Sequence, residues 1–178
     1  MKINRSLLFA AVGIALVAAV WQVLAIFVGN TSIGVNFPAV HAIGIPAFLG
    51  WASYYIAGGK FATQIKATIT NLSGMVWGVV MMAIIVFFAS KGWNQYLGGF
   101  LALLVGGFFI VFQAHIKYIG NIPLMFMGST AFFAVYNGQW IESIIVVIIG
   151  LFCGGFLGLF GQKIGEFLDE KVFKKTSK

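Results

Sequence analysis

Long apolar runs with few charges follow one another along almost the whole chain, and they constrain the fold more than any other feature. We place these runs at residues 6–28, 39–57, 66–90, 96–117, 121–136 and 140–161. About 20 apolar residues in a helix cross the roughly 30 Å hydrocarbon core of a bilayer. Strands of a membrane barrel would alternate apolar and polar residues, whereas these runs are continuously apolar. The pattern therefore predicts an all-α integral membrane protein with six transmembrane helices.

The composition supports the same fold class, because 61% of the 178 residues are hydrophobic and 8% are charged. A water-soluble monomer needs more polar surface than this. Since the connections are short, we expect one transmembrane bundle over residues 1–161 and no separate soluble domain. The tail 162–178, QKIGEFLDEKVFKKTSK, places Ile164, Phe167, Leu168 and Val172 on one helical face. It is predicted to be a basic amphipathic helix on the cytoplasmic membrane surface.

The basic residues predict the orientation of the bundle. One side of the predicted topology collects ten of them: Lys2, Arg5, Lys60, Lys66, Lys117, Lys163, Lys171, Lys174, Lys175 and Lys178. The other side has Lys91 alone. Because cytoplasmic loops carry an excess of Lys and Arg, both termini should be cytoplasmic, in a bacterial inner membrane. The net charge of +7 is accounted for in this way, and no nucleic-acid partner is expected.

Two stretches of the chain nearly repeat one another. GIPAFLGWASYYIAGGK at 44–60 aligns with NIPLMFMGSTAFFAVYNG at 121–138, so that Pro46 matches Pro123 and Gly50 matches Gly128. The Gly-x-x-x-Gly pairs at 74–78 and 154–158 match as well. Chance similarity of two Gly-rich apolar segments is the alternative, but the matches keep their order across two spans. We therefore predict two three-helix repeats, about 6–90 and 96–161, of inverted topology.

The second and fifth spans are predicted to be short or broken, and to line a solute path. Pro38, Gly44, Pro46 and Gly50 should interrupt the second, while 16 residues of helix in the fifth would extend roughly 24 Å. Irregular backbone inside a bilayer is tolerated where it is buried or lines a cavity. The candidate path residues are Pro46, Gly50, Trp51, Ser53, Tyr54, Pro123, Gly128, Ser129, Thr130, Phe132 and Tyr136. Anchoring at the membrane interface is an equally good interpretation of Trp51 and Tyr54.

Few other residues carry chemistry. His41, His115 and Glu142 could move a proton or gate an entrance, although each lies near a span end where solvation also explains it. No catalytic set, metal-binding spacing or cofactor motif is present, so we expect neither an enzyme nor a metal or cofactor site. Glycines at helical spacing are predicted to pack helices closely, within the bundle or between copies in a homo-oligomer. These are Gly74, Gly78, Gly150, Gly154 and Gly158.

Three motifs carry a family resemblance. FLGWASYYIAGG, NLSGMVWGVVM and IPLMFMGSTAFFAVYNGQW, followed by a Gly-rich last span, resemble the small bacterial inner-membrane proteins of domain of unknown function family 1097. The resemblance covers most of the chain and implies six spans in an inner membrane, with no assigned activity or functional residues. In overall plan the chain also looks like the six-span urea and amide channels, by architecture alone.

These observations lead to one functional hypothesis and two alternatives. The hypothesis is a channel or facilitator for a small neutral or weakly polar solute, since hydroxyls and aromatic walls suit such solutes. One alternative is a proton-coupled transporter that uses His41 or His115. The other is a non-transporting membrane scaffold or regulator whose basic tail recruits a partner.

Overall fold

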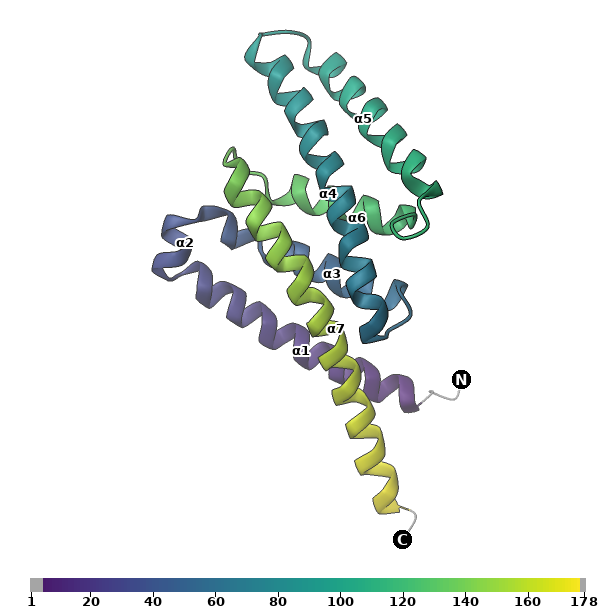
Figure 1. Cartoon of the computed structure of the whole chain (residues 1–178). Coiled ribbons are helices and arrows are strands. Elements are labelled where there is room, and N and C mark those ends of the chain that lie inside the picture. Colours follow the sequence, from purple (N-terminus) through teal and green to yellow (C-terminus); the bar gives the residue numbers. More distant parts are fainter. Residues whose placement is uncertain (1–4, 177–178) are drawn as a thin grey trace.

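The computed structural model describes residues 5–176, and all regular structure in this range is helical. Four helices are long: α1 (Arg5–Gly29), α4 (Phe61–Ser90), α5 (Gln95–Phe112) and α7 (Trp140–Thr176). Shorter ones are α2 (Ser32–Asn36), α3 (Gly44–Ile56) and α6 (Ile122–Val135), with the 3-10 helices η1 (Pro38–Ala42) and η2 (Gln113–His115). Figure 1 shows their arrangement. The predicted all-helical class is confirmed for the described residues.

Four segments are long and apolar enough to cross a membrane, and this makes the chain a membrane protein. They are Leu7–Gly29, Phe61–Ser90, Gln95–His115 and Trp140–Lys171. The predicted spans 39–57 and 121–136 instead contain the 13-residue α3 and the 14-residue α6. At 1.5 Å per residue each extends about 20 Å, short of the roughly 30 Å hydrocarbon core. The described chain therefore has four full-length apolar helices and two short ones.

The second predicted span is broken at its start. Pro38 stands at the beginning of η1 and Pro46 in the first turn of α3, where a missing N–H costs no helical hydrogen bond. Gly50 lies in the middle of α3 and does not interrupt it, contrary to the prediction. Its role is close packing, because the missing side chain makes room for the backbone of Leu151 on α7.

Asparagines and glycines set the other helix ends. The Asn94 side chain accepts hydrogen bonds from the first backbone N–H groups of α5, and the Asn121 side chain accepts one from Leu124 in α6. Such caps satisfy donors that have no partner inside the helix. Gly92 and Gly138, with φ of +66° and +96°, form the turns before α5 and α7. Each turn therefore uses the backbone region that glycine adopts without strain.

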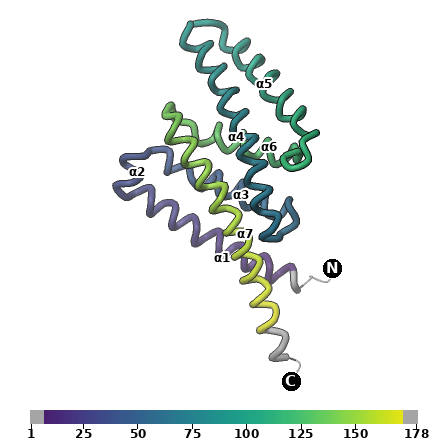
Figure 2. The backbone as a smooth tube through the Cα atoms, viewed as in Figure 1, coloured from purple at the N-terminus to yellow at the C-terminus, as the bar shows by residue number. Residues whose placement is uncertain are grey.

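The short helices α3 and α6 form the centre of the bundle. The largest contacts join α3 to α7 and α4 to α6, followed by α1 to α7 and α4 to α5. Helices α3 and α6 also contact each other, and the tube in Figure 2 shows both running across the middle of the molecule. Helices α1 and α5 are consequently outermost, with many exposed apolar side chains such as Val23, Phe27, Phe100 and Leu103.

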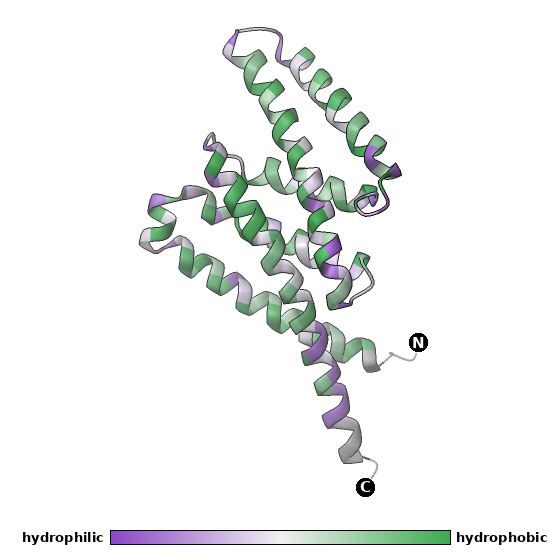
Figure 3. Cartoon of the chain, viewed as in Figure 1, coloured by the Kyte–Doolittle hydropathy of each residue, from purple (hydrophilic) through white to green (hydrophobic). Residues whose placement is uncertain are grey.

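Hydropathy changes along α7. Figure 3 shows this helix hydrophobic over its first part and increasingly hydrophilic toward its last described turns. The helix is continuous from Trp140 to Thr176, so the predicted tail begins without a break from the span before it. Residues 177–178 and the side chain of Val172 lie outside what the structure describes. The placement of the tail on a membrane surface stays a prediction.

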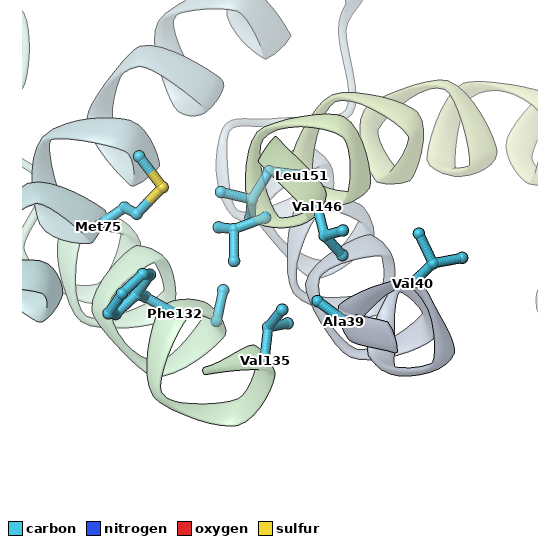
Figure 4. Packing of buried hydrophobic residues seen from close by; sticks show 9 residues of the cluster. Ala39, Val40, Met75, Phe132, Val135, Val146 and Leu151 are labelled. Atoms are coloured by element: carbon cyan, nitrogen blue, oxygen red, sulfur yellow. The ribbon is translucent and has the colours of Figure 1, made fainter. Parts of the chain in front are cut away.

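An apolar core occupies the space where η1, α4, α6 and α7 meet. Figure 4 shows Met75, Phe132, Val135, Val146 and Leu151 converging there beside Ala39 and Val40. A second cluster of Met81, Ala102, Ile110 and Met125 joins α4, α5 and α6. Buried side chains therefore fill the middle of the bundle on both sides of α6.

Candidate functional site

Four glycines bring the short helices into backbone contact with the long ones. A Cβ atom at Gly74 or Gly128 would lie less than 3.0 Å from the backbone of the facing helix in the α4–α6 pair. The same holds for Gly50 and Gly154 in the α3–α7 pair. Real Cβ atoms do not adopt such separations, so only glycine permits this approach. All five glycines predicted to pack helices are buried at helix contacts. Gly74, Gly78 and Gly154 face the backbone of the neighbouring helix, whereas Gly150 faces the Pro46 side chain and Gly158 the Tyr54 side chain.

A polar pair is buried next to these contacts. Ser53 of α3 and Asn71 of α4 are both fully buried, and the Asn71 side-chain NH2 donates to the Ser53 hydroxyl oxygen over 2.8 Å. The Ser53 hydroxyl donates to the Leu49 carbonyl, also over 2.8 Å, and the Met127 sulfur of α6 lies 3.4 Å away. The sequence places Ser53 among the path candidates and Asn71, a lone amide in the middle of an apolar span, among the residues expected to hydrogen-bond between helices, as it does here.

Two clefts of similar size open on the bundle. The first, which we call the basic cleft, measures about 440 Å³, and its lining includes Thr63, Lys66, Thr70, Ile116, Lys117 and Asn121. The second, the acidic cleft, measures about 400 Å³ and is lined by residues that include Asn36, Phe37, Gln139, Trp140, Glu142 and Ile145. The basic cleft lies at the beginning of α4 and the acidic cleft at the beginning of α7. Figure 1 shows these two helix starts at opposite sides of the view.

The Ser53–Asn71 pair lies just beyond the basic cleft. Thr70 lines the cleft and precedes Asn71 on α4. Ala57 lines it too, and its backbone N–H donates to the Ser53 carbonyl one helical turn away. On the other side, Ile145 of the acidic cleft precedes Val146 of the apolar core. The polar pair and the core therefore stand between the two clefts.

The aromatic candidates are packed inside the bundle. Trp51 is 5% exposed and lies against Gly158, with its ring stacked 6.1 Å from that of Phe48. The Tyr54 hydroxyl lies 2.7 Å from the Gly59 carbonyl and 2.9 Å from the Gln162 side-chain oxygen. It thereby ties the end of α3 to α7.

The aromatic residues at the end of α6 and the start of α7 are packed together in the same way. Phe132 lies 5.7 Å from the Tyr136 ring and 6.1 Å from the Trp140 ring, between centroids. Of these three, Trp140 reaches a cleft lining. Most of the aromatic candidates therefore pack between helices inside the bundle and do not line a cleft.

The remaining candidates lie apart from one another. Pro123 and Thr130 are exposed, so Thr130 is not part of the buried interface between α3 and α6, and the Ser129 hydroxyl donates to its own helix at Phe126. His41 in η1 and His115 in η2 are also exposed. The structure does not bring the two histidines together.

Glu142 has a structural partner. Its carboxylate accepts a hydrogen bond of 2.5 Å from the backbone N–H of Ala39, which fastens the beginning of η1 to α7. In the part of the chain that the structure describes, no group of three His, Cys, Asp or Glu side chains is placed to hold a metal ion. The polar groups that line the two clefts are mainly amides, hydroxyls and the charged side chains of Lys66, Lys117 and Glu142.

The chain has recognisable relatives. The family model described as "Protein of unknown function (DUF1097)" matches residues 11–166. A protein of Escherichia coli (strain K12), described as "Uncharacterized protein YahC", is 26% identical over 165 residues, which cover 92% of this chain and 93% of that protein. No solved structure matches the chain. The arrangement of helices above therefore has to be interpreted from its own geometry.

Proposed function

This chain belongs to the DUF1097 family, and we propose that it is a membrane facilitator for a small solute, built from two inverted repeats. The family resemblance drawn from the sequence motifs is thus confirmed, while the activity is our proposal. The observation that carries it is the pair of clefts at opposite ends of the bundle, with the Ser53–Asn71 pair and the apolar core between them.

The helix contacts support the repeat. If α1, α3 and α4 correspond to α5, α6 and α7, then the α3–α7 contact corresponds to α6–α4, and these are the two largest. The α1–α7 contact likewise corresponds to α5–α4, and these come next. Exchanging the two halves turns the α3–α6 contact into α6–α3, which is the same contact. A two-fold relation between the halves accounts for this pattern, as in transporters made of inverted repeats.

Individual residues support it further. Gly50 meets the backbone of Leu151, and the equivalent glycine of the second copy, Gly128, meets Asn71, which is equivalent to Leu151. Gly74 meets the Met125 backbone, and Gly154 meets Ala47 in the same relation. The motif similarity aligned these glycines with one another but did not say which residues they meet. The matching contact partners lie far apart in the sequence, so they add support that the alignment did not contain.

The two clefts correspond in the same way. The basic cleft lies between the end of α3, the start of α4 and the segment before α6. The acidic cleft lies between the α6–α7 connection, the start of α7 and the segment before η1 and α3. Equivalent entrances on the two membrane faces suit a solute path between the halves. Because the core in Figure 4 fills the space between them, passage requires α3 and α6 to move relative to their neighbours.

The polar pair indicates the solute class. Its equivalents in the second copy are Ala131 and Leu151, both fully buried and apolar. An apolar pair is therefore compatible with this packing, and the hydrogen-bonding groups of Ser53 and Asn71 are not needed for the fold. A few hydrogen bonds in an otherwise apolar barrier suit a small neutral or weakly polar solute.

The proposal includes the orientation and the assembly. The end of the bundle with Lys60, Lys66 and Lys117 faces the cytoplasm by the excess of positive charge there, in a bacterial inner membrane. Homo-oligomers are supported by Gly99 and Gly107 on α5, at each of which a side chain would meet open space. Neighbouring glycines on the same helix, Gly98 and Gly106, are already used against α4.

Flux measurement in proteoliposomes tests the proposal. Stopped-flow assays would compare urea, acetamide, glycerol, formate and short alcohols, each with and without a pH gradient. The test variant is S53A/N71L, which copies the apolar pair of the other half, and the control is T130A at an exposed position. We expect one solute class to pass faster than through empty liposomes, and S53A/N71L alone to slow it. Equal flux in wild type and S53A/N71L, with both folded, would remove the polar pair from the path.

A further inference from the structure

We propose that the basic cleft is a binding site for an oxyanion of the phosphate type. The same cleft is an entrance in the transport proposal, but this inference does not depend on transport, because binding can be measured without flux. It rests on two lysines, the Asn121 side chain at a helix start and the Thr63 hydroxyl, which share one cleft of about 440 Å³.

The positive charge of the cleft is not neutralised from within. Lys66 and Lys117 both line it, and no carboxylate is part of the lining that the structure describes. The chain has four acidic residues in all. Glu142 belongs to the acidic cleft at the other end, and Glu166, Asp169 and Glu170 lie in the last turns of α7. Two like charges in one cleft repel each other, so a bound anion relieves an unfavourable interaction.

The Asn121 side chain at a helix start adds a donor to the two ammonium groups. The 14-residue α6 begins at the edge of the cleft, and its N-cap Asn121 and first-turn Leu124 are part of the lining. The Asn121 side-chain oxygen accepts from the Leu124 N–H, so the NH2 group of the same amide remains for a ligand. The positive end of the helix dipole favours an anion at the same place.

Thr63 favours an oxyanion that carries a proton. Its side chain is half-buried at the cleft, and its hydroxyl donates to the Lys60 carbonyl over 2.9 Å. With this hydrogen used in the helix, the Thr63 oxygen offers only lone pairs to the cleft. Hydrogenphosphate and phosphate monoesters present an O–H to such an acceptor together with charged oxygens for the lysines. A halide or a carboxylate anion has no such O–H.

The size and the walls of the cleft leave the source of the phosphate open to two possibilities. Its volume lies in the range of about 300–1,000 Å³ that small-molecule sites occupy. Ile56, Ile116 and Leu124 give it an apolar wall beside the charged one. Free phosphate would use the charged wall alone, while a lipid headgroup would also use the apolar wall.

Binding assays on the full chain distinguish these sources. The protein is placed in nanodiscs of zwitterionic phosphatidylcholine, and binding of ³²P-labelled inorganic phosphate is measured by equilibrium dialysis. In a second arm, the nanodiscs contain phosphatidic acid and phosphatidylcholine in equal parts, and native mass spectrometry counts how many molecules of each lipid the protein retains. The test variant is K66Q/K117Q, whose positions are exposed and should not affect folding. The control is K60Q/K163Q, which removes the same charge at exposed positions outside the cleft lining.

We expect K66Q/K117Q to weaken binding at least about tenfold, because each ammonium contributes a charged hydrogen bond, and K60Q/K163Q to bind like wild type. If K66Q/K117Q binds less phosphate in the dialysis arm, the ligand is free phosphate. If this variant loses binding only in the lipid arm, the ligand is a lipid headgroup. No binding in either arm, or equal weakening in both variants, would overturn the proposed site.

Discussion

Replacing Gly128 by alanine should separate α4 from α6, although the new side chain is a single methyl group. A Cβ at this position would lie less than 3.0 Å from the Asn71 backbone, whereas ordinary contacts begin at 3.4 Å, so the helices must part by more than 0.4 Å. Backbone atoms cannot rotate away as a flexible side chain can. Overpacking costs about 1–3 kcal/mol, and we take about 3 here.

Alanine also raises helix propensity by about 1 kcal/mol relative to glycine, which offsets part of this loss. The net expectation for G128A is a free energy of unfolding lower by about 2 kcal/mol, measured by SDS titration of the protein in mixed micelles. G99A is the matched control, since nothing lies within 4 Å of a Cβ at that position on α5. It should be neutral or stabilising by up to about 1 kcal/mol. If G128A proves as stable as G99A, the backbone approach of α4 and α6 described above is wrong.

Three further variants probe other parts of the bundle. Ser53→Ala should lower the free energy of unfolding by about 1–3 kcal/mol, because it leaves the buried Asn71 amide without its partner, and S53A/N71L should recover most of this in the same titration. Trp77→Ala removes a ring stacked 4.5 Å from that of Phe109 and should cost about 1 kcal/mol from the lost aromatic pair. Trp77→Phe should lower the free energy of unfolding by less than Trp77→Ala, and equal losses for the two variants would contradict the stacking argument. K91C should react with a membrane-impermeant maleimide on intact cells and K60C only after permeabilisation; the reverse pattern would invert the proposed orientation.

The candidate site was predictable in part. The sequence pointed to Ser53 and to the closely packed glycines, because a hydroxyl and small residues stand out in an apolar span. It did not separate Thr130 from Ser53, because the two have similar hydroxyl chemistry, although Thr130 is exposed and Ser53 is buried. It assigned Asn71 to hydrogen bonding between helices rather than to the path, and it used Lys66 and Lys117 only as markers of orientation. Hydropathy says that a residue is at membrane depth, but not which side of its helix meets another helix.

The sequence by itself determined the class of the protein and the position of its helices. Continuous apolar runs need helices in a bilayer, Pro38 and Pro46 mark the break before α3, and Asn94 and Asn121 mark the starts of α5 and α6. These are local effects of backbone and solvent, so they can be recognised from short stretches of chain. The tertiary structure decided which helices meet, that Ser53 finds Asn71, and that Lys66 and Lys117 share one cleft. Those pairings depend on backbone contacts at glycines between segments far apart in the chain, and no local pattern specifies the partner.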